Sequence, residues 1–209
     1  MAPELTLRLI DATCAAIDAN ADLLTRLDSA IGDGDHGHNM RRGFQAIAAQ
    51  RDEMVGLPLG AALQKAGMAL VMKVGGASGP LYGSLLISMA KAAGETPKDA
   101  NGVAAIWAEG IEAVKRRGKS QVGEKTMLDV LVPAQEALCA AAADGVAPGQ
   151  IAARVRKAAA DGLEATRPMK ATKGRASYLG ERSVGHLDPG AQSSALLIGA
   201  VCDVLESEA

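Results

Sequence analysis

Three aspartates, Asp28, Asp33 and Asp35, lie within eight positions of one another in the stretch LDSAIGDGDHGHNM (27–40), where glycines separate them. Carboxylate oxygens suit Mg²⁺, an ion that proteins commonly share between carboxylates and substrate phosphates. A cation would also explain why like charges gather on one loop, because they otherwise repel. Two ions held by three carboxylates would leave coordination sites for phosphate oxygens, as phosphoryl transfer requires. The alternative is that these residues are solvated turn residues and helix caps, because turns use aspartate and glycine anyway.

Three more glycine-rich connections look more specialised than simple turns: VGGASGPLYGS (74–84), RRGKSQVGEKT (116–126) and the long polar segment 169–192. In the first, small residues precede Pro80, which suits the first position of a helix, and N–H groups at a helix N-terminus favour an anion. The long segment lacks periodicity, contains cations such as Arg175 and ends in Asp188-Pro189-Gly190 before the last helix. An acidic, a glycine-rich and a basic loop together are expected of a magnesium–nucleotide site.

The common nucleotide and calcium motifs do not fit this chain. The glycines at 32, 34 and 37 match G-x-G-x-x-G, but a helical pattern precedes them where the Rossmann fingerprint requires a strand. A phosphate-binding P-loop ending at Gly118-Lys119-Ser120 would need glycine at position 113, which is Ala113. An EF-hand loop starting at Asp33 would place Phe44 where a bidentate glutamate is required.

Apolar residues recur with a helical period along nearly the whole chain. Leu5, Leu9, Ala12, Ala16 and Leu23 follow a 3.6-residue repeat, and no convincing alternating strand pattern or βαβ spacing is found. We therefore expect an all-α fold of about eight helices, with short loops that favour antiparallel neighbours. Alanine permits close approach of the helices. After the first helix, further helices are predicted over 38–54, 60–73, 80–93, 98–117, 126–143, 149–166 and 190–206.

Composition limits the class of protein. At 209 residues the chain is expected to form one domain, 1–209. A net charge of −2 and an aromatic content of 2% argue against nucleic-acid binding. The three cysteines are far apart in apolar helical patterns and read as reduced thiols of a cytoplasmic protein. No apolar run approaches the length of a membrane span.

In the sequences of these four loops, the chain resembles the nucleotide-binding L subunit of dihydroxyacetone kinase. The matching stretches are LDSAIGDGDHGHNMRRGF (27–44), VGGASGPLYG (74–83), RGKSQVGEKTMLDVLVPA (117–134) and KGRASYLGERSVGHLDPGA (173–191). The resemblance implies a closed barrel of eight antiparallel amphipathic helices, with ADP or ATP and two Mg²⁺ in the loops at one end. It implies that Asp28, Asp33 and Asp35 hold the metal, while Arg175 or a nearby cation stabilises the transferred phosphoryl group. The residues implied to line the nucleotide are His36, Gly37, His38, Asn39, Ala77, Ser78, Gly118, Met127, Arg175, Asp188, Pro189 and Gly190.

The resemblance further implies that the substrate, dihydroxyacetone or a related short ketose, sits covalently on a separate K subunit. ADP would then be retained and rephosphorylated by a phosphohistidine donor of the phosphotransferase system, although exchange with free ATP stays open. A Mg-dependent helical nucleotide hydrolase is a rival, but its acids usually lie on helices as glutamate pairs. A non-catalytic nucleotide-binding regulator is another, and contact with a transcription regulator would be a second role.

Overall fold

The computed structural model describes residues 2–94, 97 and 99–207. This part of the chain is helical and contains no strand, which confirms the all-α prediction. The predicted helix over 98–117 begins at Ala100, and residue 98 lies outside the described residues. In chain order the elements are α1 (Pro3–Ile31), α2 (His36–Ala48), α3 (Arg51–Met54), α4 (Leu59–Lys73), α5 (Ser78–Ala93), α6 (Ala100–Gly118), α7 (Leu128–Ala143), α8 (Pro148–Ala165), the 3₁₀ helix η1 (Arg175–Ser183) and α9 (Pro189–Glu206).

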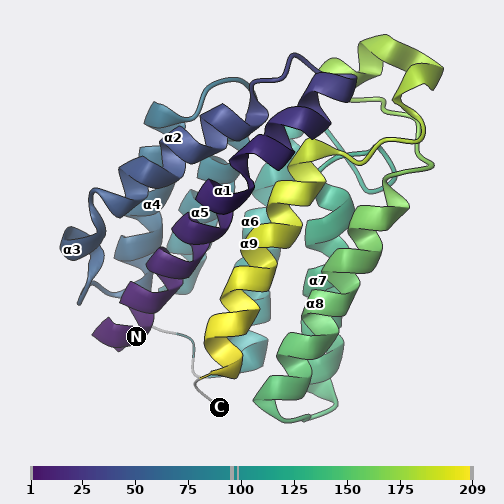
Figure 1. The fold of residues 1–209 in the computed structure, drawn as a ribbon. Helices are drawn as coiled ribbons and strands as arrows, with labels where there is room; N and C mark the ends of the chain where they lie inside the picture. Colours follow the sequence, from purple (N-terminus) through teal and green to yellow (C-terminus); the bar gives the residue numbers. More distant parts are fainter. Residues whose placement is uncertain (1, 95–96, 98, 208–209) are drawn as a thin grey trace.

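The long helices, all of those described except α3 and η1, form a closed ring of neighbours. Each packs against the next long helix along the chain, and α9 packs against α1 as well as α8. The turns that follow α1, α4, α6 and α8 lie at one end of the ring, together with η1 (Figure 1). The start of α1 and the end of α9 lie at the other end (Figure 1). The ring therefore gathers the four specialised loops at one end of the molecule.

The hydrophobic core lies inside this ring. Its fully buried side chains, such as Leu24 of α1, Leu70 of α4 and Leu128 of α7, belong to one contiguous cluster. Two glycines show how closely small residues allow helices to approach. A Cβ atom on Gly67 of α4 would lie 3.1 Å from the carbonyl oxygen of Gly83, and one on Gly83 of α5 would lie 3.0 Å from that of Gly67.

The prediction of a single helix over 38–54 is wrong, because the chain breaks between α2 and α3. At the break, the Gln50 N–H bonds a carbonyl three residues back, a contact typical of a tightened helix end. The apolar pattern does not reveal this break, because Met54 of α3 is buried in the same core as the apolar side chains of α2.

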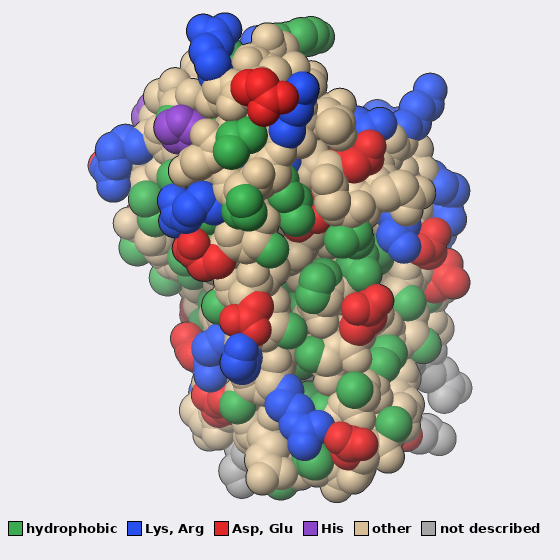
Figure 2. All heavy atoms as spheres, turned by 90° about the vertical axis from the view of Figure 1, so that its right-hand side faces the viewer, with side chains coloured by type: hydrophobic (Ala, Val, Ile, Leu, Met, Phe, Trp, Pro, Cys, Tyr) green, Lys and Arg blue, Asp and Glu red, His purple; other side chains and the backbone are tan. Residues whose placement is uncertain are grey.

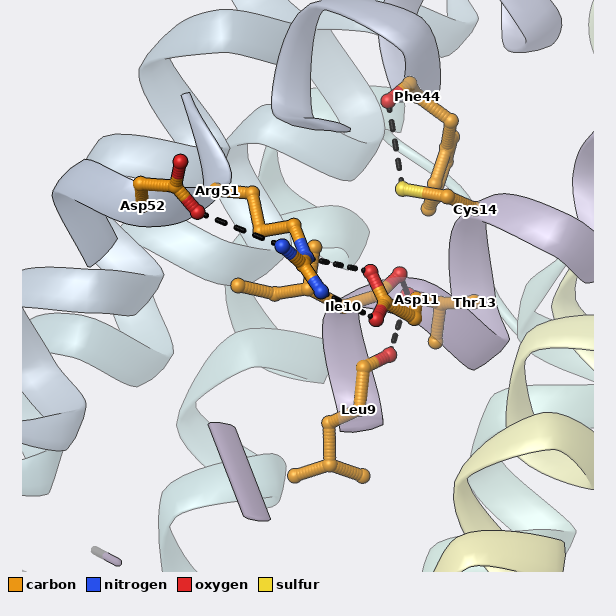
Figure 3. Close-up of polar contacts among 8 residues, drawn as sticks. All are labelled: Leu9, Ile10, Asp11, Thr13, Cys14, Phe44, Arg51 and Asp52. Carbon is orange, nitrogen blue, oxygen red and sulfur yellow. Dashed lines mark hydrogen bonds and ion pairs between the residues drawn. The ribbon is translucent and has the colours of Figure 1, made fainter. Parts of the chain in front are cut away.

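Polar contacts fasten this region to α1. The Arg51 guanidinium of α3 pairs with Asp11 of α1, with 2.7 Å between Nε and Oδ1, and also lies 3.4 Å from Asp52 (Figure 3). One turn further along α1, the Cys14 thiol contacts the carbonyl oxygen of Phe44 at 3.3 Å. Burial, reinforced by Asp11, raises the pKa of Cys14 to about 11, so this cysteine stays a protonated thiol.

Two predicted boundaries at the loop end are corrected. Helix α1 continues to Ile31 and α2 begins at His36, so the loop within the acidic stretch 27–40 is only four residues long and Asp28 lies in the last turn of α1. Helix α5 begins at Ser78, which makes Pro80 its third residue rather than its first. Proline is tolerated there, because the first four N–H groups of a helix have no partner within the helix.

The segment 169–192, expected to lack regular structure, contains η1. Its turns are closed locally: Ser177 Oγ donates to the carbonyl oxygen of Gly174 at 2.6 Å, and Ser183 Oγ donates to that of Gly180 at 2.7 Å. A 3₁₀ turn of this kind needs no amphipathic repeat, so the hydrophobic pattern gives no signal for it.

Charges of both signs are interleaved on the face that carries α8 and η1 (Figure 2). Ion pairs such as Arg154–Asp144 and Lys170–Glu181 contribute to this pattern. Among the described helices, none combines the length and apolar character that crossing a bilayer would demand.

Candidate functional site

The three aspartates come together where α1 turns into α2. Each of Asp28, Asp33 and Asp35 offers a carboxylate oxygen, and the three atoms lie within 4.8 Å of one another. Asp28 is mostly buried, and its Oδ2 accepts hydrogen bonds from the backbone N–H groups of Asp35, at 2.8 Å, and His36, at 3.1 Å. These bonds fold the turn back on α1 and bring the two exposed carboxylates beside the buried one. A compact set of hard oxygen donors fits a divalent cation such as Mg²⁺.

Glycine is required inside this turn. A Cβ atom on Gly32 would lie 2.1 Å from Asp28 Oδ1, and Gly34 has a φ of +75°, which L side chains rarely adopt. The glycines between the aspartates are therefore part of what brings the carboxylates together.

Arg175 lies beside the aspartates at the loop end. It is the first residue of η1, and its Nη2 lies 3.0 Å from Asp33 Oδ2. Its side chain is 66% exposed. The pair brings together two candidate residues that are 142 positions apart in the sequence, and it places a cation beside the carboxylates.

His36 joins the starts of α2 and α5. The imidazole is buried, with Nδ1 3.0 Å from Ser78 Oγ and Nε2 3.0 Å from Ser193 Oγ. Burial lowers the pKa of His36, and the carboxylates of Asp28 and Asp35 offset only part of this effect. Burial therefore favours the neutral form of the ring, which touches two hydroxyl groups and also hydrogen-bonds the backbone of Pro189.

The other candidates on α2 lie in different surroundings. Gly37 packs against α1, since a Cβ atom there would lie 1.9 Å from the carbonyl oxygen of Ala21. Asn39 is buried, and its Oδ1 accepts a hydrogen bond from Arg42 Nη2 at 2.7 Å, where Gly75 packs over it. His38 is exposed, and no contact in the described part of the chain links it to the aspartates.

At the α5 side, Ala77 caps the helix that Ser78 begins. Gly118, the last residue of α6, lies against Leu81 of α5, since a Cβ atom on it would be 3.4 Å from Leu81 Cδ2. Gly118 therefore borders this helix rather than the aspartates. His186 has an exposed side chain.

The start of α9 supplies the remaining candidates. Asp188 caps the helix by accepting a hydrogen bond from the Ala191 N–H at 2.7 Å, and the next residue, Pro189, is buried. A Cβ atom on Gly190 would lie 3.7 Å from Met127, whose side chain is part of the core. Burial, with a smaller effect of Asp129, raises the pKa of Asp188 to about 7, although Ala191 N–H and Lys125 act in the opposite direction.

Several buried polar residues of this end were missed by sequence reasoning. Lys125 is 1% exposed, and its Nζ donates to the carbonyl oxygens of Thr166, at 2.6 Å, and His186, at 2.5 Å. Asp129 is also buried and accepts the N–H of Thr126 at 2.7 Å. Tyr82, Ser193 and Ser194 form a further buried set. For the residues on α5, α7 and α9 the only sequence signal is that polar residues interrupt apolar helical runs, and that pattern does not show which partners they meet. Lys125 lies in the loop before α7 and has no such signal.

Comparison with known proteins identifies the family of this chain. Residues 30–203 match the DAK2 domain family. The ADP-binding subunit DhaL of PEP-dependent dihydroxyacetone kinase 1 from Listeria innocua is 48% identical over 185 residues, which is 88% of each chain. The ADP-binding subunit DhaL of the PEP-dependent dihydroxyacetone kinase from Escherichia coli K12 is 40% identical over 174 residues, 83% of each chain.

A solved structure has the same fold. The dihydroxyacetone kinase of C. freundii in complex with AMP-PNP and Mg²⁺ superposes with a TM-score of 0.79 over 97% of this chain and 34% of that one, at 23% identity. The family model covers most of the present chain, and the two bacterial relatives match it over more than four-fifths of its length. The chain therefore belongs to the DAK2 domain family.

Proposed function

We propose that this chain is the nucleotide-binding subunit of a kinase for dihydroxyacetone or a related short ketose, and that residues 1–209 act as one domain. The observation that carries the proposal is the cluster of three carboxylates at the loop end of the ring, where the neighbouring His36 contacts Ser78 at the start of α5. The 48% identical relative is itself named as the ADP-binding subunit of such a kinase. Dihydroxyacetone would be bound covalently by a partner K subunit, which covers the loop end during transfer.

In this proposal, Asp28, Asp33 and Asp35 would hold two Mg²⁺ ions. Bound Mg²⁺ supplies charge neutralisation at the phosphate oxygens of the nucleotide. The Ser78 hydroxyl and the first N–H groups of α5 would receive a phosphate, because a helix N-terminus carries unpaired donors and a partial positive charge. The turn at Asp188, Pro189 and Gly190, together with Gly118 and Met127, would complete the pocket.

Arg175 would stabilise the negative charge of the phosphoryl group during transfer. It already lies beside Asp33, and its exposed guanidinium can reach a phosphate bound next to that carboxylate. The contribution of this chain is thus positioning and electrostatic stabilisation, which are the main requirements of phosphoryl transfer. The acceptor hydroxyl would come from the ketose on the partner.

ADP would stay bound between turnovers and be rephosphorylated in place by a phosphohistidine protein of the phosphotransferase system. The relatives named as PEP-dependent support this route over exchange of free ATP. A purified chain that retains ADP through dialysis, as seen by native mass spectrometry, would support retention, and a nucleotide-free chain that turns over added ATP would overturn it. The ADP-bound form would also be the one presented to a transcription regulator.

The aspartate cluster is tested with Asp35→Asn, which removes one charge and keeps the shape of the side chain. In EDTA this variant should melt at the same temperature as the parent or higher, because it relieves repulsion among carboxylates. With Mg²⁺ and ADP, the parent should gain several degrees and the variant should gain little. Thermal melting followed by circular dichroism measures both effects, and phosphoryl transfer in the presence of the K subunit should be lost.

Asp161→Asn is the matched control, because Asp161 is an exposed aspartate on α8 whose partner is Lys157, one turn away. It should behave like the parent in both conditions. The proposal fails if Asp35→Asn retains the stabilisation by Mg²⁺–ADP and normal transfer.

A further inference from the structure

A buried chain of side chains links α2, α5 and α9 behind the candidate site. His36 contacts Ser78 through Nδ1 and Ser193 through Nε2, each at 3.0 Å. Ser193 Oγ in turn lies 2.8 Å from the hydroxyl oxygen of Tyr82, and all of these groups except Ser78 are buried. The proposed nucleotide function uses Ser78, and His36 is among the residues implied to line the nucleotide, but neither Tyr82 nor Ser193 has a role in it.

The hydrogens shared between His36 and its two serine partners can be arranged in two consistent ways. A hydroxyl donates one hydrogen, and a neutral imidazole donates from one nitrogen only. In the first arrangement, Ser193 donates to Nε2, the Nδ1–H donates to Ser78 Oγ, and the Ser78 hydrogen is left for a ligand. In the second, the Nε2–H donates to Ser193 and Ser78 donates to Nδ1, so that Ser78 presents only lone pairs.

The surroundings favour the first arrangement. Ser78 is the first residue of α5, where an anion requires donors and lone pairs would repel it. Ser194 Oγ donates to the carbonyl oxygen of Gly190 at 2.9 Å, so Ser193 does not need to fill that acceptor. The Tyr82 hydroxyl keeps its proton, because burial raises its pKa to about 12. It can donate to Ser193 Oγ at 2.8 Å, and Ser194 Oγ at 2.8 Å and the Gly190 carbonyl oxygen at 3.2 Å are its alternative acceptors.

We propose that Tyr82 and Ser193 are positioning residues that hold His36 in the Nδ1–H tautomer, so that the Ser78 hydroxyl donates to a nucleotide phosphate. The order of donation is Tyr82 to Ser193, Ser193 to His36, His36 to Ser78, and Ser78 to the phosphate. This inference rests on the proposed function, which supplies the phosphate.

The test compares Ser193→Ala with Ser194→Ala. The two serines are neighbours on α9, both are buried, and each contacts Tyr82 at 2.8 Å and Gly190, but only Ser193 contacts His36. Calorimetry with Mg²⁺–ADP should show affinity about tenfold weaker for Ser193→Ala, the effect of one hydrogen bond to a charged group. Ser194→Ala should stay within about twofold of the parent, with a similar change in melting temperature to that of Ser193→Ala.

Nitrogen NMR of histidine-labelled protein reads the tautomer directly, and the chain has only three histidines. In the parent, His36 should show a protonated Nδ1 and an unprotonated Nε2, with and without Mg²⁺–ADP. Ser193→Ala should shift the populations toward Nε2–H, Tyr82→Phe should shift them partly, and Ser194→Ala should leave them unchanged.

A parent His36 protonated on Nε2 would overturn the inference, as would equal losses of affinity in the two serine variants. These results differ from a failure of the proposed function, in which the parent chain would not bind Mg²⁺–ADP at all. The tautomer measurement does not depend on that binding.

Discussion

The two carboxylate oxygens of Asp28, at the loop end, have different surroundings. Asp28 uses Oδ2 to accept two N–H groups at the start of α2, whereas Oδ1 accepts no hydrogen bond within the described chain. One oxygen therefore holds the fold of the turn while the other is left for a ligand. Loading the site and ordering the start of α2 are thus coupled through one side chain, which makes Asp35 rather than Asp28 the suitable residue for the charge-removal test.

Asp188 gives a prediction about pH. In the folded protein the Asp188 carboxyl group keeps its proton up to about pH 7, whereas the ordinary pKa of an aspartate is 3.8. Between pH 3.8 and about pH 7 the folded state therefore binds more protons than the unfolded state. The contribution of Asp188 to the free energy of unfolding is therefore fully present below pH 4 and is lost as the pH rises through about 7. The loss is at most about 4 kcal/mol.

Asp188→Asn should remove this dependence, because asparagine caps a helix about as well as aspartate and carries no charge. The variant and the parent should melt at similar temperatures at pH 4, and the variant should be the more stable at pH 8. Melting curves over pH 4–8 measure the difference. A variant that loses stability relative to the parent as the pH rises would show instead that attraction to Lys125 outweighs the burial of Asp188.

Among elements, the long segment between α8 and α9 is closed at its base by Lys125. The ammonium group bonds carbonyl oxygens near the two ends of the segment, at Thr166 and His186, and the Gly185 N–H bonds the carbonyl of Arg167 at 2.8 Å. The two ends of the segment that carries Arg175 are therefore held together by Lys125 where the segment joins α8 and α9. Burying a cation costs free energy unless it is hydrogen-bonded, and here the carbonyl oxygens supply those bonds. Removing the cation leaves these acceptors without a donor.

Lys125→Met should lower the free energy of unfolding by about 2–4 kcal/mol in urea titration, because the buried carbonyl group of Thr166 and the partly buried one of His186 lose their donor. Lys173→Met is the matched control, since Lys173 lies on the segment between α8 and α9 that Lys125 closes, and it pairs with Glu124 at 3.5 Å near the surface. Its effect should stay below about 1 kcal/mol. Equal effects of the two substitutions would show that the buried contacts of Lys125 contribute nothing beyond an exposed ion pair.

The same elements show what the sequence can predict. The 3.6-residue repeat locates the long helices, and the alternating direction of these helices brings the loops to one end. The meeting of Asp28, Asp33 and Asp35 could also be expected, because the three residues lie close together in the sequence. The pairing of Arg175 with Asp33, and of His36 with Ser193, could not, because it depends on how distant helices are placed around the ring. The break before α3 and the turns of η1 cannot be predicted for a different reason, because local hydrogen bonds determine them. At the break the apolar pattern continues, and in η1 there is no apolar pattern.

For the whole molecule, the closed ring predicts a single cooperative unfolding transition. Helix α6 carries the only tryptophan, Trp107, which packs against the same core as α1 and α9. Because each long helix has neighbours on both sides and α9 closes on α1, losing one helix exposes the core of the others. Tryptophan fluorescence, which reports on α6, and circular dichroism, which reports on all helices, should therefore give superimposable curves in urea.

Mg²⁺–ADP should shift the midpoints of both curves by the same amount, because a ligand that binds only the folded state stabilises the whole cooperative unit. Separate midpoints for the two probes would show that the ring unfolds in parts, and a shift confined to one probe would locate the ligand's effect in one part only.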